Sequence, residues 1–114
     1  MKRIEGIFRP ERLDQVIEAL TEAGFEGFTI QDARGHGRSP ERKGEWRGVA
    51  FEVTVTHKLN ITVIVEDDEV EKVAAAISRG ASTGALGDGL IAVTDLVTAF
   101  PIRAATGSAV ASEG

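Results

Sequence analysis

Two segments of the chain carry apolar residues at the spacing of a helix, and both are flanked by segments in which apolar and polar residues alternate. The first begins at Pro10, because the first helical position needs no N–H donor, and ends before Gly24; its apolar face is Leu13, Val16, Ile17 and Leu20. The second begins at Asp67-Asp68, where either aspartate can cap a helix, and ends at Gly80; its apolar face is Val70, Val73, Ala74 and Ile77. The pattern therefore predicts two helices.

The alternating segments predict four strands, at residues 2–9, 25–35, 59–65 and 90–97. The order strand, helix, strand, strand, helix, strand is that of the ferredoxin-like fold, an α+β architecture with both helices on one face of a four-stranded antiparallel sheet. In the first strand, the alternation places Ile4, Gly6 and Phe8 on one side and Arg3, Glu5, Ile7 and Arg9 on the other.

The sheet face opposite the helices has less charge than a solvated face is expected to have. It would carry Ile7 and Ile64 beside Thr29 and Thr62. We therefore expect a homo-oligomer that covers this face.

Length, charge and composition exclude several classes of protein. The 114 residues suit a single domain, and the absence of cysteine excludes disulfides, a thiol nucleophile and thiolate metal sites, and favours a cytoplasmic location. No segment approaches the roughly 20 apolar residues of a membrane span, so we expect no direct membrane insertion. The net charge of −5 disfavours nucleic acid as a partner, because its binding needs clustered positive charge.

The segment from Gly35 to Lys58 is about two dozen residues long, well beyond the usual connection in a compact domain. It is locally basic and contains the only tryptophan, Trp46, in its polar middle. Trp46 either packs against its own loop or anchors a partner, because aromatic and arginine residues dominate interface hot spots. The candidate partner-binding residues are Arg42, Lys43, Trp46 and Arg47.

The stretch ASTGALGDGL, residues 81–90, combines three glycines, two hydroxyls and one carboxylate. It is either an ordinary turn from helix to strand or a backbone cradle for an anion, in which glycines let N–H groups approach the ligand closely.

In order, these blocks resemble the PII family of nitrogen-regulatory signalling proteins. The resemblance lies in MKRIEGIFRPERLDQVIEAL at the start, GHGR at 35–38, RG at 47–48, STGALGDGLIAVTDL at 82–96 and PIR at 101–103. It covers residues 1–103 and implies a flexible T-loop at about 37–57 and a B-loop at about 81–90. The small residues of 104–114 predict a flexible C-terminal tail.

The resemblance also implies a homotrimer, with adenine nucleotides bound in three inter-subunit clefts and T-loops that dock onto enzymes, transporters or regulators. It implies phosphate binding by the B-loop residues Thr83, Gly84, Gly87, Asp88 and Gly89. It further implies adenosine contacts from Ile7, Thr29 and Ile64, a close approach of Gly35 and Gly37, phosphate contacts from Arg38 and Arg103, and a carboxylate-binding Lys58.

The chain departs from the family at several of these places. Leu90 and Pro101 stand where well-known members have a lysine and an arginine, so we expect ADP or AMP to be favoured over ATP, whose extra phosphates need cations. Ser39 replaces a glutamine that helps to hold magnesium and 2-oxoglutarate, which makes 2-oxoglutarate sensing less favourable; the resemblance to a carboxysome-associated branch suggests bicarbonate instead. Phe51 stands at a tyrosine that enteric members have uridylylated, and it has no hydroxyl to modify.

The residues expected of an enzyme are absent from the sequence pattern. The two histidines, His36 and His57, are expected to bond within the loop or to be exposed, and the acidic run from Asp67 to Glu71 is explained by a helix start and has no metal-ligand spacing. We therefore predict a regulatory protein without a resident cofactor or metal. An adaptor trimer that has lost nucleotide sensing is the alternative, and a small hydrolase is a more distant one.

Overall fold

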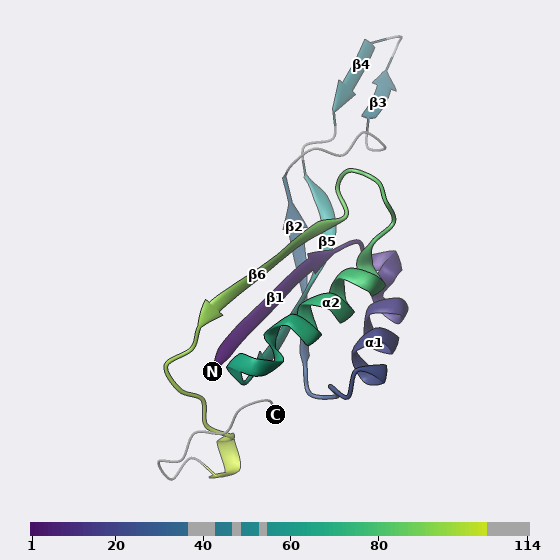
Figure 1. Cartoon of the computed structure of the whole chain (residues 1–114). Helices are drawn as coiled ribbons and strands as arrows, with labels where there is room; N and C mark the ends of the chain where they lie inside the picture. Colours follow the sequence, from purple (N-terminus) through teal and green to yellow (C-terminus); the bar gives the residue numbers. More distant parts are fainter. Residues whose placement is uncertain (37–42, 47–48, 53–54, 105–114) are drawn as a thin grey trace.

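The computed structural model describes residues 1–36, 43–46, 49–52 and 55–104, and the side chains of residues 1–36 and 55–103. Its main sheet contains β1 (Lys2–Phe8), β2 (Thr29–Gly35), β5 (Thr56–Val65) and β6 (Gly89–Asp95), in the order β2-β5-β1-β6 with antiparallel neighbours throughout. Helices α1 (Leu13–Glu22) and α2 (Val70–Ala81) cover one face of this sheet (Figure 1). The predicted ferredoxin-like fold is confirmed.

The core lies between the helices and the two central strands, β1 and β5. Burial alternates along both strands, as the period-two pattern requires. Each fully buried aliphatic or aromatic side chain contributes about 1.5–3 kcal/mol relative to an exposed one. The largest fully buried side chains are Phe8, Ile4, Leu20, Ile61, Ile77, Val16, Val63, Val65 and Val73.

Gly80 does not end α2, which corrects the prediction. The helix continues to Ala81, and Ser82 is its C-cap in an extended conformation. Gly80 instead allows the two helices to approach closely, because a Cβ at this position would lie 2.6 Å from the Cα of Val16. Arg12 secures the same contact, since its Nε donates a hydrogen bond to the backbone oxygen of Gly80 at 2.9 Å.

The start of α2 also differs from the prediction. Residues Asp67–Glu69 form a 3-10 turn whose N-cap is Glu66, and the Glu66 N–H donates to the Glu69 carboxylate at 3.2 Å. Asp67 does not cap a helix: it accepts a hydrogen bond from the N-terminal ammonium of Met1 at 2.8 Å. The first residue of the chain is thereby fastened at the start of the second helical region.

The long connection between β2 and β5 contains a hairpin that the sequence pattern did not predict. Strands β3 (Lys43–Trp46) and β4 (Val49–Glu52) pair antiparallel, with Lys43 opposite Glu52 and Trp46 opposite Val49. Figure 1 shows this hairpin beyond the ends of β2 and β5, away from the helices. A partner could therefore reach it without meeting the core of the domain.

Candidate functional site

The B-loop connects α2 to β6 through three glycines with left-handed backbone angles. The φ angles are 85° at Gly84, 90° at Gly87 and 129° at Gly89. Gly89 also lies directly against β1, since a Cβ there would come within 1.8 Å of the backbone oxygen of Ile7. The glycine spacing is therefore required by the path of the loop, whatever it binds.

The Asp88 side chain forms hydrogen bonds to the first residues of the B-loop, Thr83 and Gly84. Its carboxylate accepts hydrogen bonds from the Thr83 N–H at 2.8 Å, the Gly84 N–H at 3.0 Å and the Thr83 hydroxyl. The hydroxyl and backbone bonds from Thr83, together with Arg9, hold the pKa of Asp88 well below its usual range, because they stabilise the ionised carboxylate. The N–H groups of Thr83 and Gly84 are thus engaged inside the loop, and the role of these two residues toward a ligand stays a prediction.

Two cations hold the backbone oxygens of the second half of the loop. Arg9 donates from Nη2 to the oxygen of Leu86 at 2.7 Å and from Nε to the Asp88 carboxylate at 3.1 Å. Lys58 of β5 donates from Nζ to the oxygen of Gly87 at 2.7 Å. The B-loop is therefore joined by side-chain contacts to the residue that follows β1 and to β5.

Arg9 contacts the B-loop, and the strand pattern misplaced it. The alternation put it on the outer side with Ile7, whereas β1 ends at Phe8 and Arg9 is only 7% exposed. The one signal in the sequence is its place directly before Pro10, where the chain turns out of the strand. That signal marks a turn and does not identify Asp88 as its partner.

A cavity of about 480 Å³ lies between the B-loop and the adjoining ends of β2 and β5. Its polar lining residues are His36, Thr56, Lys58 and Asp88, and the other lining residues are apolar or glycine. Six predicted ligand-binding residues meet in it: Ile7, Gly35, Lys58, Gly87, Asp88 and Gly89. The remaining lining residues are His36, Thr56, Ala85, Leu86 and Leu90.

Other predicted ligand-binding residues lie away from this cavity. Thr29 is opposite Thr62, and Ile64 is opposite Arg3, whereas the cavity residue Ile7 is opposite Asn60. Asn60 and Ile64 are four positions apart in β5, roughly 13 Å along an extended strand. Arg103 is exposed in the short 3-10 helix Ile102–Ala104.

The rest of the predicted residues lie in or beside the T-loop. Gly37, Arg38, Ser39, Arg42 and Arg47 lie outside the described residues, and Lys43 and Trp46 belong to β3. Their predicted roles toward ligand or partner stay predictions.

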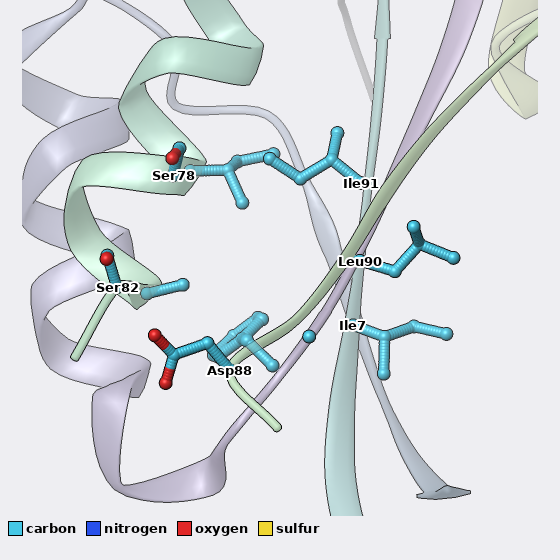
Figure 2. Close-up of a pocket in the computed structure, with 10 residues that line it drawn as sticks. Ile7, Ser78, Ser82, Asp88, Leu90 and Ile91 are labelled. Atoms are coloured by element: carbon cyan, nitrogen blue, oxygen red, sulfur yellow. The ribbon is translucent and has the colours of Figure 1, made fainter. Parts of the chain in front are cut away.

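A second hollow, of about 250 Å³, adjoins the first where β6 begins. Figure 2 shows Ser78, Ser82 and Asp88 on the helix side of the strand and Ile7 and Leu90 on the other side. The two hollows share Ile7, Asp88, Gly89 and Leu90 as lining residues. The first residues of β6 therefore separate a helix-side hollow from the cavity on the outer face.

The histidines and acidic residues form no further centre in the described part of the chain. His57 Nε2 lies 3.1 Å from the Asp32 carboxylate, and both side chains are exposed, as expected for a surface pair. Within the described ranges, no cluster of three or more His, Cys, Asp or Glu side chains is arranged to hold a metal ion. No helix in the same ranges has the length and apolar character to cross a membrane.

Comparisons with known proteins identify the family of the chain. The family model for nitrogen regulatory protein P-II matches residues 1–106. A nitrogen regulatory protein P-II of Bradyrhizobium diazoefficiens is 42% identical over 103 residues, which span 90% of this chain and 92% of that protein. Nitrogen regulatory protein P-II 1 of Escherichia coli is 39% identical over the same shares of the two chains.

A solved structure extends the similarity from sequence to fold. The crystal structure of Arabidopsis thaliana PII bound to citrate superposes with a TM-score of 0.76 at 30% sequence identity. The similarity covers 99% of this chain and 90% of the Arabidopsis chain. Family model, sequence relatives and fold point the same way: the chain belongs to the nitrogen regulatory protein P-II family of signal-transduction proteins.

Proposed function

We propose that this protein is a homotrimeric sensor that binds adenine nucleotides and reports their binding through its T-loop. The observation that carries the proposal is the cavity beside the B-loop, which gathers six of the residues predicted to bind the ligand. In the described part of the loop, the N–H groups of Leu86, Gly87 and Asp88 have no protein acceptor, unlike those of Thr83 and Gly84. Unpaired N–H groups next to a lysine are suited to phosphate oxygens.

A second copy of the chain would complete the site. Thr29, Ile64 and Arg103 do not line the cavity of their own chain, and Thr29 and Ile64 lie on the same outer sheet face as Ile7. A trimer that packs through this face brings residues of one subunit to the cavity of the next. This arrangement gives three clefts related by symmetry.

The proposed preference is for ADP or AMP over ATP. Leu90 lines the cavity with a side chain that is 66% exposed, and it supplies no charge. Pro101 likewise removes a cation from the C-terminal element. Each further phosphate needs a charged donor in a partly desolvated cleft, so a triphosphate loses more than a monophosphate does.

Lys58 gives the cavity a place for a small anion, for which we propose bicarbonate. The Arabidopsis relative was crystallised with citrate, a carboxylate ligand, and this lends support to an anion site in proteins of this shape. Bicarbonate is preferred to 2-oxoglutarate because Ser39 lacks the amide that would hold magnesium. Regulatory ligands of this kind need no resident cofactor.

The output of the sensor is a protein partner in carbon or nitrogen metabolism, docked through Arg42, Lys43, Trp46 and Arg47. Ligand binding reaches the T-loop because Lys58 follows directly after it in the chain and contacts Gly87. We place this activity in the cytoplasm and assign no catalysis to the protein. In the alternative, an adaptor trimer without nucleotide sensing, the protein still binds its partner, but adenine nucleotides do not change the affinity for that partner.

Calorimetric titration of the purified protein with ATP, ADP and AMP, each with and without bicarbonate, tests the proposal. We expect ADP or AMP to bind more tightly than ATP, and bicarbonate to strengthen that binding. Comparable dissociation constants for ATP and AMP would remove the preference. If no adenine nucleotide binds, the sensor proposal is wrong and the adaptor function is favoured. If product continues to form from ATP over many turnovers, the protein is a hydrolase.

A further inference from the structure

Arg9 is the buried charged residue of the described part of the chain. It is 7% exposed, whereas the other arginines with described side chains are half-buried or exposed. It follows directly after β1 and precedes Pro10, so its backbone is fixed by the sheet on one side and by the Pro10–Arg12 turn on the other. Burying a guanidinium is costly unless its N–H groups are paired with good geometry.

The pairing of Arg9 falls on two separate points of the B-loop. Its Nη2 donates to the Leu86 oxygen at 2.7 Å, and its Nε donates to the Asp88 carboxylate at 3.1 Å. The planar guanidinium fixes the distance between these two acceptors, because its donors have a rigid fork geometry. Asp88 in turn restrains Thr83 and Gly84, because its carboxylate accepts hydrogen bonds from their N–H groups.

This arrangement determines which way the loop presents its donors. With the Leu86 oxygen held by Arg9 and the Gly87 oxygen held by Lys58, the carbonyl groups are engaged with the domain. The N–H groups of Leu86 and Gly87, two residues that line the cavity, have no hydrogen-bond acceptor among the described residues. A loop already held in this form loses less conformational entropy when an anion binds.

We infer that Arg9 is a positioning residue, which holds the B-loop in its ligand-binding conformation before any ligand is present. The inference rests on the proposed nucleotide site for its functional consequence. Arg9 lines neither of the two hollows, and its charge is paired with that of Asp88. Its effect on a ligand therefore passes through the loop and not through direct contact.

The test compares Arg9→Lys with Arg12→Lys. Lysine keeps the charge but has no planar fork with which to hold both Leu86 and Asp88 in one geometry. Arg12 is a matched control because it also donates to a backbone oxygen, that of Gly80 at 2.9 Å, and this acceptor lies outside residues 83–88. Both variants are measured by hydrogen exchange without ligand and by calorimetry with ADP.

We expect Arg9→Lys to speed amide exchange in residues 83–88 of the ligand-free protein and to weaken ADP binding, each by about tenfold, the size expected for losing a charge-assisted bond. Arg12→Lys should leave both the exchange rate and the ADP affinity within about twofold, a change of about 0.4 kcal/mol, even if its melting temperature falls as far as that of Arg9→Lys. If Arg9→Lys does not fold, Arg9→Gln, which also lacks the guanidinium fork but leaves Asp88 in place to accept from Thr83 and Gly84, should give the same faster exchange.

Unchanged exchange in residues 83–88 of Arg9→Lys would overturn the inference. Equal losses of affinity in the two arginine variants would overturn it as well, because they would trace the effect to general stability. If the wild-type protein binds no adenine nucleotide, the proposed function fails separately. The exchange experiment then still decides whether Arg9 holds the loop.

Discussion

Lys58 and Gly87 are joined directly, since the Lys58 ammonium donates a hydrogen bond to the Gly87 backbone oxygen at 2.7 Å. The two residues belong to different parts of the site. Lys58 lies at the start of β5, where the chain returns from the T-loop, and Gly87 lies in the B-loop. A ligand that draws the ammonium toward itself therefore changes a contact of both loops at once.

Replacing Lys58 with methionine should weaken binding of ADP and of bicarbonate. The change removes a charge-assisted donor from a partly buried position, so we expect about a tenfold loss of affinity by calorimetry. Lys72→Met is the matched control, because Lys72 is exposed on α2 near the ring of Phe25 and lies outside the cavity. Equal affinity of Lys58→Met and wild type would show that the ammonium takes no part in binding.

Leu90→Lys should change which nucleotide is favoured. A lysine at this exposed cavity position adds a donor for terminal phosphate, so the affinity for ATP should rise by about fivefold to tenfold relative to AMP. Ala75→Lys adds the same charge on the exposed side of α2 and should leave the ratio unchanged. A parallel rise for all three nucleotides in Leu90→Lys would indicate general attraction of anions and contradict a specific terminal-phosphate contact.

Gly80→Ala should destabilise the fold by about 1–3 kcal/mol, because the added methyl group meets the backbone of α1. The nearest atoms would be the Cα of Val16 at 2.6 Å and the oxygen of Gln15 at 2.7 Å, neither of which is a flexible side-chain end. Gly24→Ala tests backbone strain alone, since its φ is 92° and a Cβ there meets nothing within 4 Å. Urea denaturation should rank Gly80→Ala as the more damaging of the two.

Acid should loosen the B-loop through Asp88. Its pKa is depressed in the folded protein by the hydrogen bonds from Thr83 and by Arg9, so its contribution to stability is complete above the unfolded value of about 3.9 and is lost as the pH falls below it. Asp88→Asn should therefore be less stable than wild type at pH 6, and the difference should shrink toward pH 2. Asp14→Asn, on the exposed side of α1, is the control. If the stability difference between wild type and Asp88→Asn stays constant from pH 6 to pH 2, the effect does not depend on ionisation of Asp88 and the prediction is wrong.

The fold could be predicted because its signals are local and periodic. The alternation in β1 and β5 and the stripes on α1 and α2 each bury one face, and together these faces supply most of the core of the described residues. Gly80 shows the limit of that reasoning. A glycine near a helix end signals a stop, but here close packing against Val16, a contact between distant residues, takes precedence.

The site could be predicted only in part, and for a related reason. Resemblance located Lys58, Gly87 and Gly89, which do meet in one cavity. Arg9 could not be found, because its role depends on Asp88, far along the chain, and a period-two pattern assigned it to the outer face. Likewise, sequence gives no means of telling that the Thr83 and Gly84 N–H groups are engaged by Asp88, since hydrogen-bond direction is set by the loop conformation.

The strand order has a consequence for how the protein is made. Strand β1 is synthesised first, but its two neighbours, β5 and β6, begin only at Thr56 and Gly89. At roughly 5–20 residues per second, its apolar side, Ile4 and Phe8, waits several seconds for both partners to be translated. Nascent chains should accordingly leave this apolar side of β1 without its full set of neighbouring strands until β6 has been translated.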